Sequence, residues 1–265
     1  MILDKIISVK RQEVAEAKKI RPMKELVTAA EGMPPGRDFK GALTGRQCAI
    51  IAEIKRRSPS RGIIRENADP VTIAGIYEHH GAAAISVLTD HNFFSGATDD
   101  LVNVRASVSL PVLRKDFIVD PYQIYETRVM GADAMLLIAD ILEQDILAGF
   151  IARAAFLGLD CLVEVHTRQA LDRALAAGAV IIGINNRNLD TFQVDLQTSL
   201  DLMPFISSGI TVVSESAISS RKDIETLTAA SIRAFLIGEA LMKASDIGQT
   251  MNSLMGKGGN SCDGH

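Results

Sequence analysis

The chain has 265 residues, of which 47% are hydrophobic, enough for one large domain or two small ones with a substantial core. Its formal net charge is −4, and without a basic excess to neutralise phosphates we exclude nucleic acid as the main partner. The N-terminal segment lacks the apolar core of a signal peptide, and no apolar run approaches membrane-spanning length. We therefore expect no membrane partner.

The cysteines follow neither a disulfide framework nor a metal-ligand spacing; they are Cys48, Cys161 and Cys262. Free thiols are typical of a reducing compartment, so we expect a cytoplasmic protein. Glu164 and His166 suggest metal ligation by their spacing, but no motif supplies a third ligand. We therefore expect no metal site.

Residues 1–48 precede the first predicted strand. Within them, residues 2–17 place Leu3, Ile6, Ile7 and Val14 at helical spacing. The pattern predicts an N-terminal helical extension that packs on the rest of the chain.

From residue 49 onward, short apolar runs alternate with amphipathic stretches. The predicted strands are 49–54, 84–88, 111–114, 134–138, 161–165, 180–184, 211–213 and 234–237. Their runs of Ile, Leu and Val, rather than strict alternation, are typical of parallel strands buried on both faces. Between them, helices are predicted at 70–80, 121–130 and 167–177. Asp69, Asp120 and Thr167 are their expected N-caps.

The repeated strand–helix units predict an α/β fold, a (β/α)₈ TIM barrel, over residues 49–255. A doubly wound open sheet is the alternative, but a Gly-rich dinucleotide fingerprint is absent. Residues 256–265 are polar and Gly-rich, and we expect them to be a disordered tail.

Polar residues stand where the predicted strands end, and in such barrels the carboxyl ends of the strands carry the catalytic groups. Side chains two residues apart on a strand share a face, so Glu53 and Lys55 should project together. The loops after the last two strands are the usual phosphate site of this fold, and Gly238 would let backbone N–H groups approach an anion. The arrangement predicts an enzyme that acts on a phosphorylated small molecule.

Several motifs carry a resemblance to one family. They are AEIKRRSPS (52–60), SVLTD (86–90), FFSG (93–96), LRKDF (113–117), VEVH (163–166), GINNRNL (183–189), SES (214–216) and LIGEALM (236–242). In this order the chain resembles indole-3-glycerol-phosphate synthase, from its N-terminal helix to about Met242. The resemblance implies a (β/α)₈ barrel of tryptophan biosynthesis without metal or organic cofactor. It would convert 1-(2-carboxyphenylamino)-1-deoxyribulose 5-phosphate to indole-3-glycerol phosphate, carbon dioxide and water.

The resemblance also implies roles for individual residues. Lys115 would be the general acid of ring closure, and we expect nearby Lys55 to lower its pKa by like-charge repulsion. Lys55 would pair with the substrate carboxylate or act as the acid in dehydration. Glu164 would be the base of the final step, sharing that role with Glu53.

The remaining positions implied by the resemblance bind or orient the substrate. Polar contacts to its hydroxyls and carboxylate are expected from Asn185 and Arg187, and Glu215 would orient a hydroxyl or a lysine. The phosphate would be held by Ser58, Ser216, Gly238 and Glu239. The aromatic ring would lie in an apolar slot made by Phe94, Phe117, Leu136 and Leu189.

One residue departs from the family pattern, which commonly has Gly where this chain has Ala217. We expect its methyl group to restrict φ or crowd the phosphate and to shift affinity. Two other functions stay open on the sequence: another phosphate-binding barrel enzyme, or an inactive barrel kept as a scaffold. The glutamates alone would also fit structural ion pairs, and the phenylalanines would fit core packing. We expect a monomer or a weak dimer.

Overall fold

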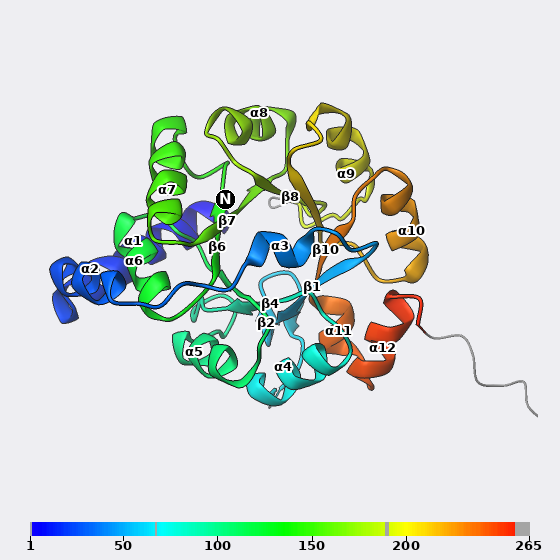
Figure 1. The fold of residues 1–265 in the computed structure, drawn as a ribbon, viewed down its shortest axis with the longest axis horizontal. Helices are drawn as coiled ribbons and strands as arrows, with labels where there is room; N and C mark the ends of the chain where they lie inside the picture. Colours follow the sequence, from blue (N-terminus) through cyan, green and yellow to red (C-terminus); the bar gives the residue numbers. More distant parts are fainter. Residues whose placement is uncertain (1, 67, 189–190, 258–265) are drawn as a thin grey trace, which may run out of the picture.

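The computed structural model describes residues 2–66, 68–188 and 191–257, and parallel strands in the described part close into a barrel (Figure 1). The barrel order is β1-β10-β9-β8-β7-β6-β5-β4. The barrel strands are β1 (Ala49–Ile54), β4 (Ala84–Leu88), β5 (Val112–Lys115), β6 (Ala134–Ile138), β7 (Asp160–Val165), β8 (Ile181–Asn185), β9 (Thr211–Glu215) and β10 (Ala234–Ile237). The closed topology confirms the (β/α)₈ barrel and excludes the open sheet.

Helices surround the barrel, as the alternation of patterns predicted (Figure 1). They are α1 (Ile2–Ile20), α2 (Met23–Glu31), α3 (Phe39–Leu43), α4 (Pro70–His79), α5 (Thr98–Ser107), α6 (Pro121–Val129), α7 (Gln144–Phe156), α8 (Arg168–Ala176), α9 (Gln197–Leu202), α10 (Arg221–Ala229), α11 (Glu239–Lys243) and α12 (Ile247–Leu254), with a 3₁₀ turn at Met203–Phe205. The predicted N-caps are confirmed, because Asp69, Asp120 and Thr167 each accept a hydrogen bond from a backbone N–H of the first helical turn.

Successive residues of a strand face alternately into the barrel and out toward the helices. On β1, Ala49 and Ile51 belong to the apolar core inside the barrel, whereas Ile50 and Ala52 pack beneath the surrounding helices. The same alternation continues to the carboxyl end of the strand and directs Glu53 into the barrel mouth. Polar side chains therefore lie in a layer above an apolar interior.

Two of the N-terminal helices, α1 and α3, lie at opposite ends of the barrel. Phe39 and Leu43 of α3 are buried against the interior residues Ala49 and Ile181, so α3 closes the amino end. Helix α1 lies at the far end in Figure 1, and its residue Ile6 lines the cavity at the carboxyl ends of the strands. Helix α2 packs beside α6.

Three predicted strands end later than expected, because polar residues continue the ladder. Lys115 pairs with Leu88 of β4, and Asn185 pairs with Glu215. A short antiparallel hairpin, β2 (Arg57–Ser58) with β3 (Gly62–Ile63), follows β1 and was not predicted. Within the described ranges, we find no helix with the length and apolarity needed to span a membrane.

Candidate active site

A cavity of about 470 Å³ opens at the carboxyl ends of the strands, within the size range of small-molecule sites. It is lined by Glu53, Lys55, Ser58, Phe94, Lys115, Phe117, Leu136, Glu164, Asn185, Arg187, Glu215, Ser216, Gly238 and Glu239. Every predicted site residue that the structure describes is therefore in one place. Leu189, the other member of the predicted apolar slot, lies outside the described residues.

Lys115 lines this cavity and lies among carboxylates. Its Nζ is 2.9 Å from Glu164 Oε2 and 3.4 Å from Glu215 Oε2, while Lys55 forms an ion pair with Glu53. Burial by itself lowers the pKa of Lys115, but attraction to Glu164, Glu215 and Glu53 outweighs it and raises that pKa above its ordinary value. The expectation that Lys55 lowers it is wrong, because the charges that dominate around Lys115 are negative.

The site holds the ammoniums of Lys55 and Lys115 against the carboxylates of Glu53, Glu164 and Glu215. Burial opposes ionisation of Glu164, but Lys115, a nearby histidine and a hydrogen bond from Asn185 lower its pKa to about 2. Burial raises the pKa of Glu215 to about 7; Lys115 opposes this, and repulsion from Glu164 and Glu53 adds to it. Glu215 thus keeps its proton to a higher pH than Glu164 does.

Two glycines make room for these carboxylates. A Cβ atom on Gly183 would lie 2.0 Å from Glu215 Oε1, and one on Gly238 would lie 2.3 Å from Glu53 Oε2. Both distances are far below van der Waals contact, so any side chain at either position must displace the glutamate. Gly238 was predicted for its backbone alone, and the structure adds this second requirement.

The loop after β9 has an unusual backbone. Ser216 has φ of 64° and Ala217 has φ of 63°, so two consecutive non-glycine residues are left-handed. This conformation costs an L-residue about 1–2 kcal/mol. A glycine at position 217 would adopt it without that cost.

Three cationic side chains surround the side chain of Glu239, which also lines the cavity. Its carboxylate lies 3.1 Å from Arg61 Nε, 3.3 Å from Arg187 Nη2 and 2.7 Å from Lys243 Nζ. The burial of this carboxylate opposes ionisation, but the three cations lower its pKa. Arg61 and Lys243 were not among the predicted site residues, although Arg61 follows directly on the basic motif at 52–60.

Apolar residues line the same cavity as the charged ones and form a slot within it. The rings of Phe94 and Phe117 have centroids 6.0 Å apart with planes tilted by 38°, and Leu136 lines the same cavity. Ile2, Leu3 and Ile6 of α1 also line it. Sequence reasoning missed these three, because their helical spacing shows that α1 packs on the barrel but not at which end.

His166 is a further contact of Glu164. Its Nε2 lies 3.4 Å from Glu164 Oε1, and its Nδ1 lies 3.0 Å from Asp140 Oδ2. Burial lowers the pKa of His166, but Asp140 and Glu164 outweigh it and raise that pKa. Across the part of the chain that the structure describes, no three His, Cys, Asp or Glu side chains are grouped to hold a metal ion. The Glu164–His166 spacing reflects this contact instead.

With the geometry established, comparison with known proteins identifies the family. A family model described as indole-3-glycerol phosphate synthase matches residues 3–254. The chain belongs to this family. An indole-3-glycerol phosphate synthase from Burkholderia ambifaria is 49% identical over 254 residues, covering 94% of this chain and 97% of the relative. One from Bordetella pertussis is 48% identical over 258 residues, covering 96% and 98%.

Membership confirms that the chain is a carboxy-lyase of tryptophan biosynthesis, as the resemblance implied. The alternative of a different phosphate-binding barrel enzyme is therefore set aside. Among solved structures, KGPDC from Streptococcus mutans aligns with a TM-score of 0.61 at 13% identity, covering 80% of this chain and 97% of its own. The tryptophan synthase A-subunit from Pyrococcus furiosus aligns with 0.60 at 13%, covering 80% and 98%. These two likenesses concern the fold alone.

Proposed function

We propose that this chain performs the family's ring closure with the residues that line this cavity. The observation that carries the proposal is that Lys115, paired with Glu164 and Glu215, lines the same cavity as Phe94 and Phe117. A substrate with an aromatic ring, a carbonyl and a phosphate needs an apolar surface, an acid–base pair and an anion site. The cavity provides all three types of group.

The substrate is oriented by its two ends. Its aromatic ring lies against Phe94 and Phe117, and its carboxylate meets Lys55. Its phosphate is bound by Ser58, Ser216 and the backbone N–H groups at Gly238 and Glu239, where β9 and β10 end. Asn185 and Arg187 contact the hydroxyls between these ends.

Ring closure begins when the ring carbon that bears the carboxylate attacks the carbonyl carbon. Lys115 donates its proton to the carbonyl oxygen, which becomes a hydroxyl group. Carbon dioxide then leaves, and the electron pair of the broken bond returns to the ring. Because the surrounding carboxylates keep Lys115 protonated, it enters the step in the form that a general acid requires.

Dehydration completes the indole. The hydroxyl group takes a proton from a lysine, with Lys55 as our assignment, and leaves as water. Glu164 accepts the proton from the neighbouring carbon, with Glu53 sharing this role. The charge of Lys115 lowers the pKa of Glu164, so loss of the lysine proton makes Glu164 a stronger base for this step. Glu215 holds Lys115 in place.

We also propose how the chain is organised and where it works. Residues 1–48 would form an extension whose first helix roofs the cavity, and residues 49–255 would form the catalytic barrel. The protein would act in the cytoplasm as a monomer or weak dimer. Sedimentation at assay concentrations tests the oligomeric state.

The assay that tests the function uses the carboxyphenylamino substrate and follows indole fluorescence. The chain contains no Trp, so the product signal has no tryptophan background. We expect turnover by the unaltered chain and a loss of about 10²–10⁴-fold in Lys115→Met, the range for removing a general acid. Lys19→Met, which breaks an exposed pair with Glu16, is the matched control and should keep full activity. Undiminished turnover in Lys115→Met would reject the assignment.

A further inference from the structure

Lys10 of α1 is a buried lysine that the proposed mechanism does not use. Only 4% of the residue is exposed, and its Nζ lies 2.6 Å from Glu13 Oε2, 3.0 Å from Asp90 Oδ2 and 3.0 Å from Asp116 Oδ1. Burial lowers its pKa, but Asp116 and Asp90 outweigh that effect and raise it, so the ammonium stays charged. Burying an ion is costly unless its partners are well placed.

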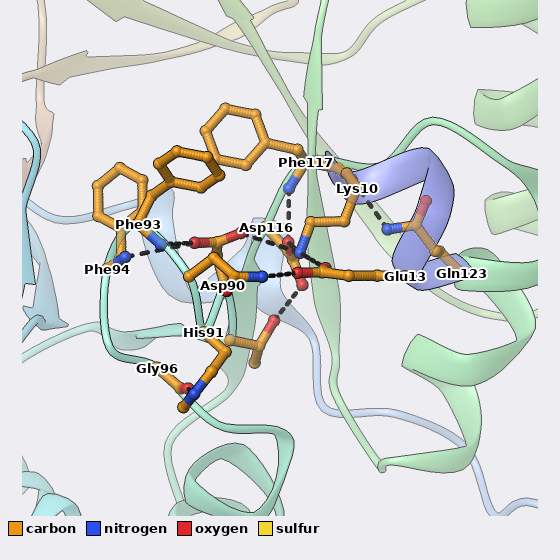
Figure 2. A network of polar contacts seen from close by, with 12 residues as sticks. Lys10, Glu13, Asp90, His91, Phe93, Phe94, Gly96, Asp116, Phe117 and Gln123 are labelled. Atoms are coloured by element: carbon orange, nitrogen blue, oxygen red, sulfur yellow. Dashed lines mark hydrogen bonds and ion pairs between the residues drawn. The ribbon is translucent and has the colours of Figure 1, made fainter. Parts of the chain in front are cut away.

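The partners of Lys10 hold the backbone of the apolar slot (Figure 2). Asp90 Oδ1 accepts hydrogen bonds from the backbone N–H groups of Phe93 at 2.8 Å and Phe94 at 3.3 Å. Asp116 Oδ1 accepts one from the N–H of Phe117 at 2.8 Å. Of the three carboxylates that Lys10 binds, Asp90 therefore fixes the backbone of Phe94 and Asp116 that of Phe117, the two aromatic residues of the slot.

Asp90 depends on Lys10 more than Asp116 does. Its Oδ2 is buried and accepts no hydrogen bond from any described residue, so the ammonium 3.0 Å away is what compensates its charge. Asp116 Oδ2 is also bound by Thr89 at 2.6 Å and Arg114 at 3.1 Å. Removal of Lys10 would leave the Asp90 carboxylate buried without compensation, and the loop that carries Phe94 would rearrange to solvate it.

Lys10 also fixes the roof of the slot. Leu3 and Ile6 lie seven and four residues before it, which places all three on one face of α1. Leu3 and Ile6 line the cavity that contains the slot. The Lys10 ammonium thus links α1 to the two loops that carry Phe94 and Phe117, through its ion pairs with Asp90 and Asp116.

Resting on the proposed function, we propose that Lys10 is a positioning residue for recognition of the substrate's aromatic ring. It sets the separation of Phe94 and Phe117 through Asp90 and Asp116 and holds α1 over them. It touches neither the reacting atoms nor the phosphate site. Its loss should therefore weaken binding of the aromatic part of a ligand and spare binding of the phosphate part.

The test compares Lys10→Met with Lys18→Met. Lys18 belongs to the same helix and also links it to the barrel, through an exposed pair with Asp120 at 2.7 Å, so it is the matched control. Two probes are titrated by calorimetry: indole-3-glycerol phosphate and glycerol 3-phosphate. We expect Lys10→Met to bind the indole probe at least tenfold more weakly and glycerol 3-phosphate within twofold of the unaltered chain. Lys18→Met should change neither.

A second variant covers the case in which Lys10→Met does not fold. Lys10→Met combined with Asp90→Asn removes the uncompensated charge together with its partner, and it should show the same selective loss, by at least threefold. Equal loss of both probes, or affinity for the indole probe within twofold of the unaltered chain, overturns the proposal. Absence of turnover by the unaltered chain would instead reject the proposed function, since binding of the two probes is measured independently.

Discussion

Lys115 Nζ lies 2.9 Å from Glu164 Oε2 in the barrel mouth, so the proposed acid and the proposed base form a buried ion pair. Each group sets the protonation of the other: Glu164 is the strongest of the attractions that raise the pKa of Lys115, and Lys115 is the strongest of those that lower the pKa of Glu164. Loss of a proton from one group therefore changes the pKa of the other.

Glu164→Gln should reduce turnover by about 10²–10⁴-fold, because an amide cannot accept the final proton. The amide keeps the size of the side chain, so the fold should persist. Steady-state kinetics with indole fluorescence measure the effect. Asp172→Asn, which disrupts an exposed pair with Arg168, is the control and should be fully active. Turnover of Glu164→Gln within threefold of the control would remove Glu164 from the mechanism.

Glu215 should make the fold less stable as pH rises. Its pKa is raised from 4.5 to about 7 in the folded state, so the folded chain binds this proton more tightly than the unfolded chain. That contribution is complete below pH 4.5 and is lost as pH rises toward 7, which amounts to on the order of 3 kcal/mol. The free energy of unfolding in urea should fall less between pH 5 and pH 8 in Glu215→Gln than in the unaltered chain. Equal decreases would contradict the raised pKa.

Gly238→Ala should reduce activity without unfolding the protein. The new Cβ would lie 2.3 Å from Glu53 Oε2, so Glu53 must move and its ion pair with Lys55 is disturbed. We expect a loss of turnover of roughly tenfold or more, since small misplacements in an active site are costly. Gly75→Ala on α4 is the control, because its Cβ would meet nothing within 4 Å. Full activity in Gly238→Ala would show that the position of Glu53 is unimportant.

Ala217→Gly should stabilise the protein. Ala217 has φ of 63°, and relief of this conformation outweighs the greater flexibility of glycine in the unfolded chain, by about 0.5–1 kcal/mol. The same change at exposed Ala155 of α7 should destabilise by about 1 kcal/mol, because glycine is a poor helix former. Thermal unfolding of both variants measures the opposite signs. Destabilisation by both would show that Ala217 is not strained.

The barrel and the residues that line its site could be predicted, because both follow from the alternation of side chains along each strand. Glu53 and Lys55 are two residues apart, and their common direction depends only on the strand being extended. Glu164 and Glu215 stand at the ends of their apolar runs, and a closed parallel barrel brings all such ends together. The exact ends of the strands were harder to predict, because Lys115 and Asn185 are polar yet belong to their strands.

The electrostatics could not be predicted, because they depend on distances between strands. The sequence placed a lysine near Lys115, but the structure surrounds it with carboxylates, and the sign of the pKa change is reversed. The raised pKa of His166 likewise depends on its contact with Asp140 from the neighbouring loop. The burial of Lys10 depends on where α1 lies on the barrel, which its helical spacing does not specify.

A double-mutant cycle on Lys115 and Glu164 tests the central claim most directly. The quantity is kcat/KM for Lys115→Met, Glu164→Gln and the combined variant, measured by indole formation. Residues that act as one unit show strongly non-additive losses of activity. We therefore predict that kcat/KM of the combined variant is within about threefold of that of the less active single variant. Losses that multiply, as they do for independent sites, would contradict a shared catalytic site.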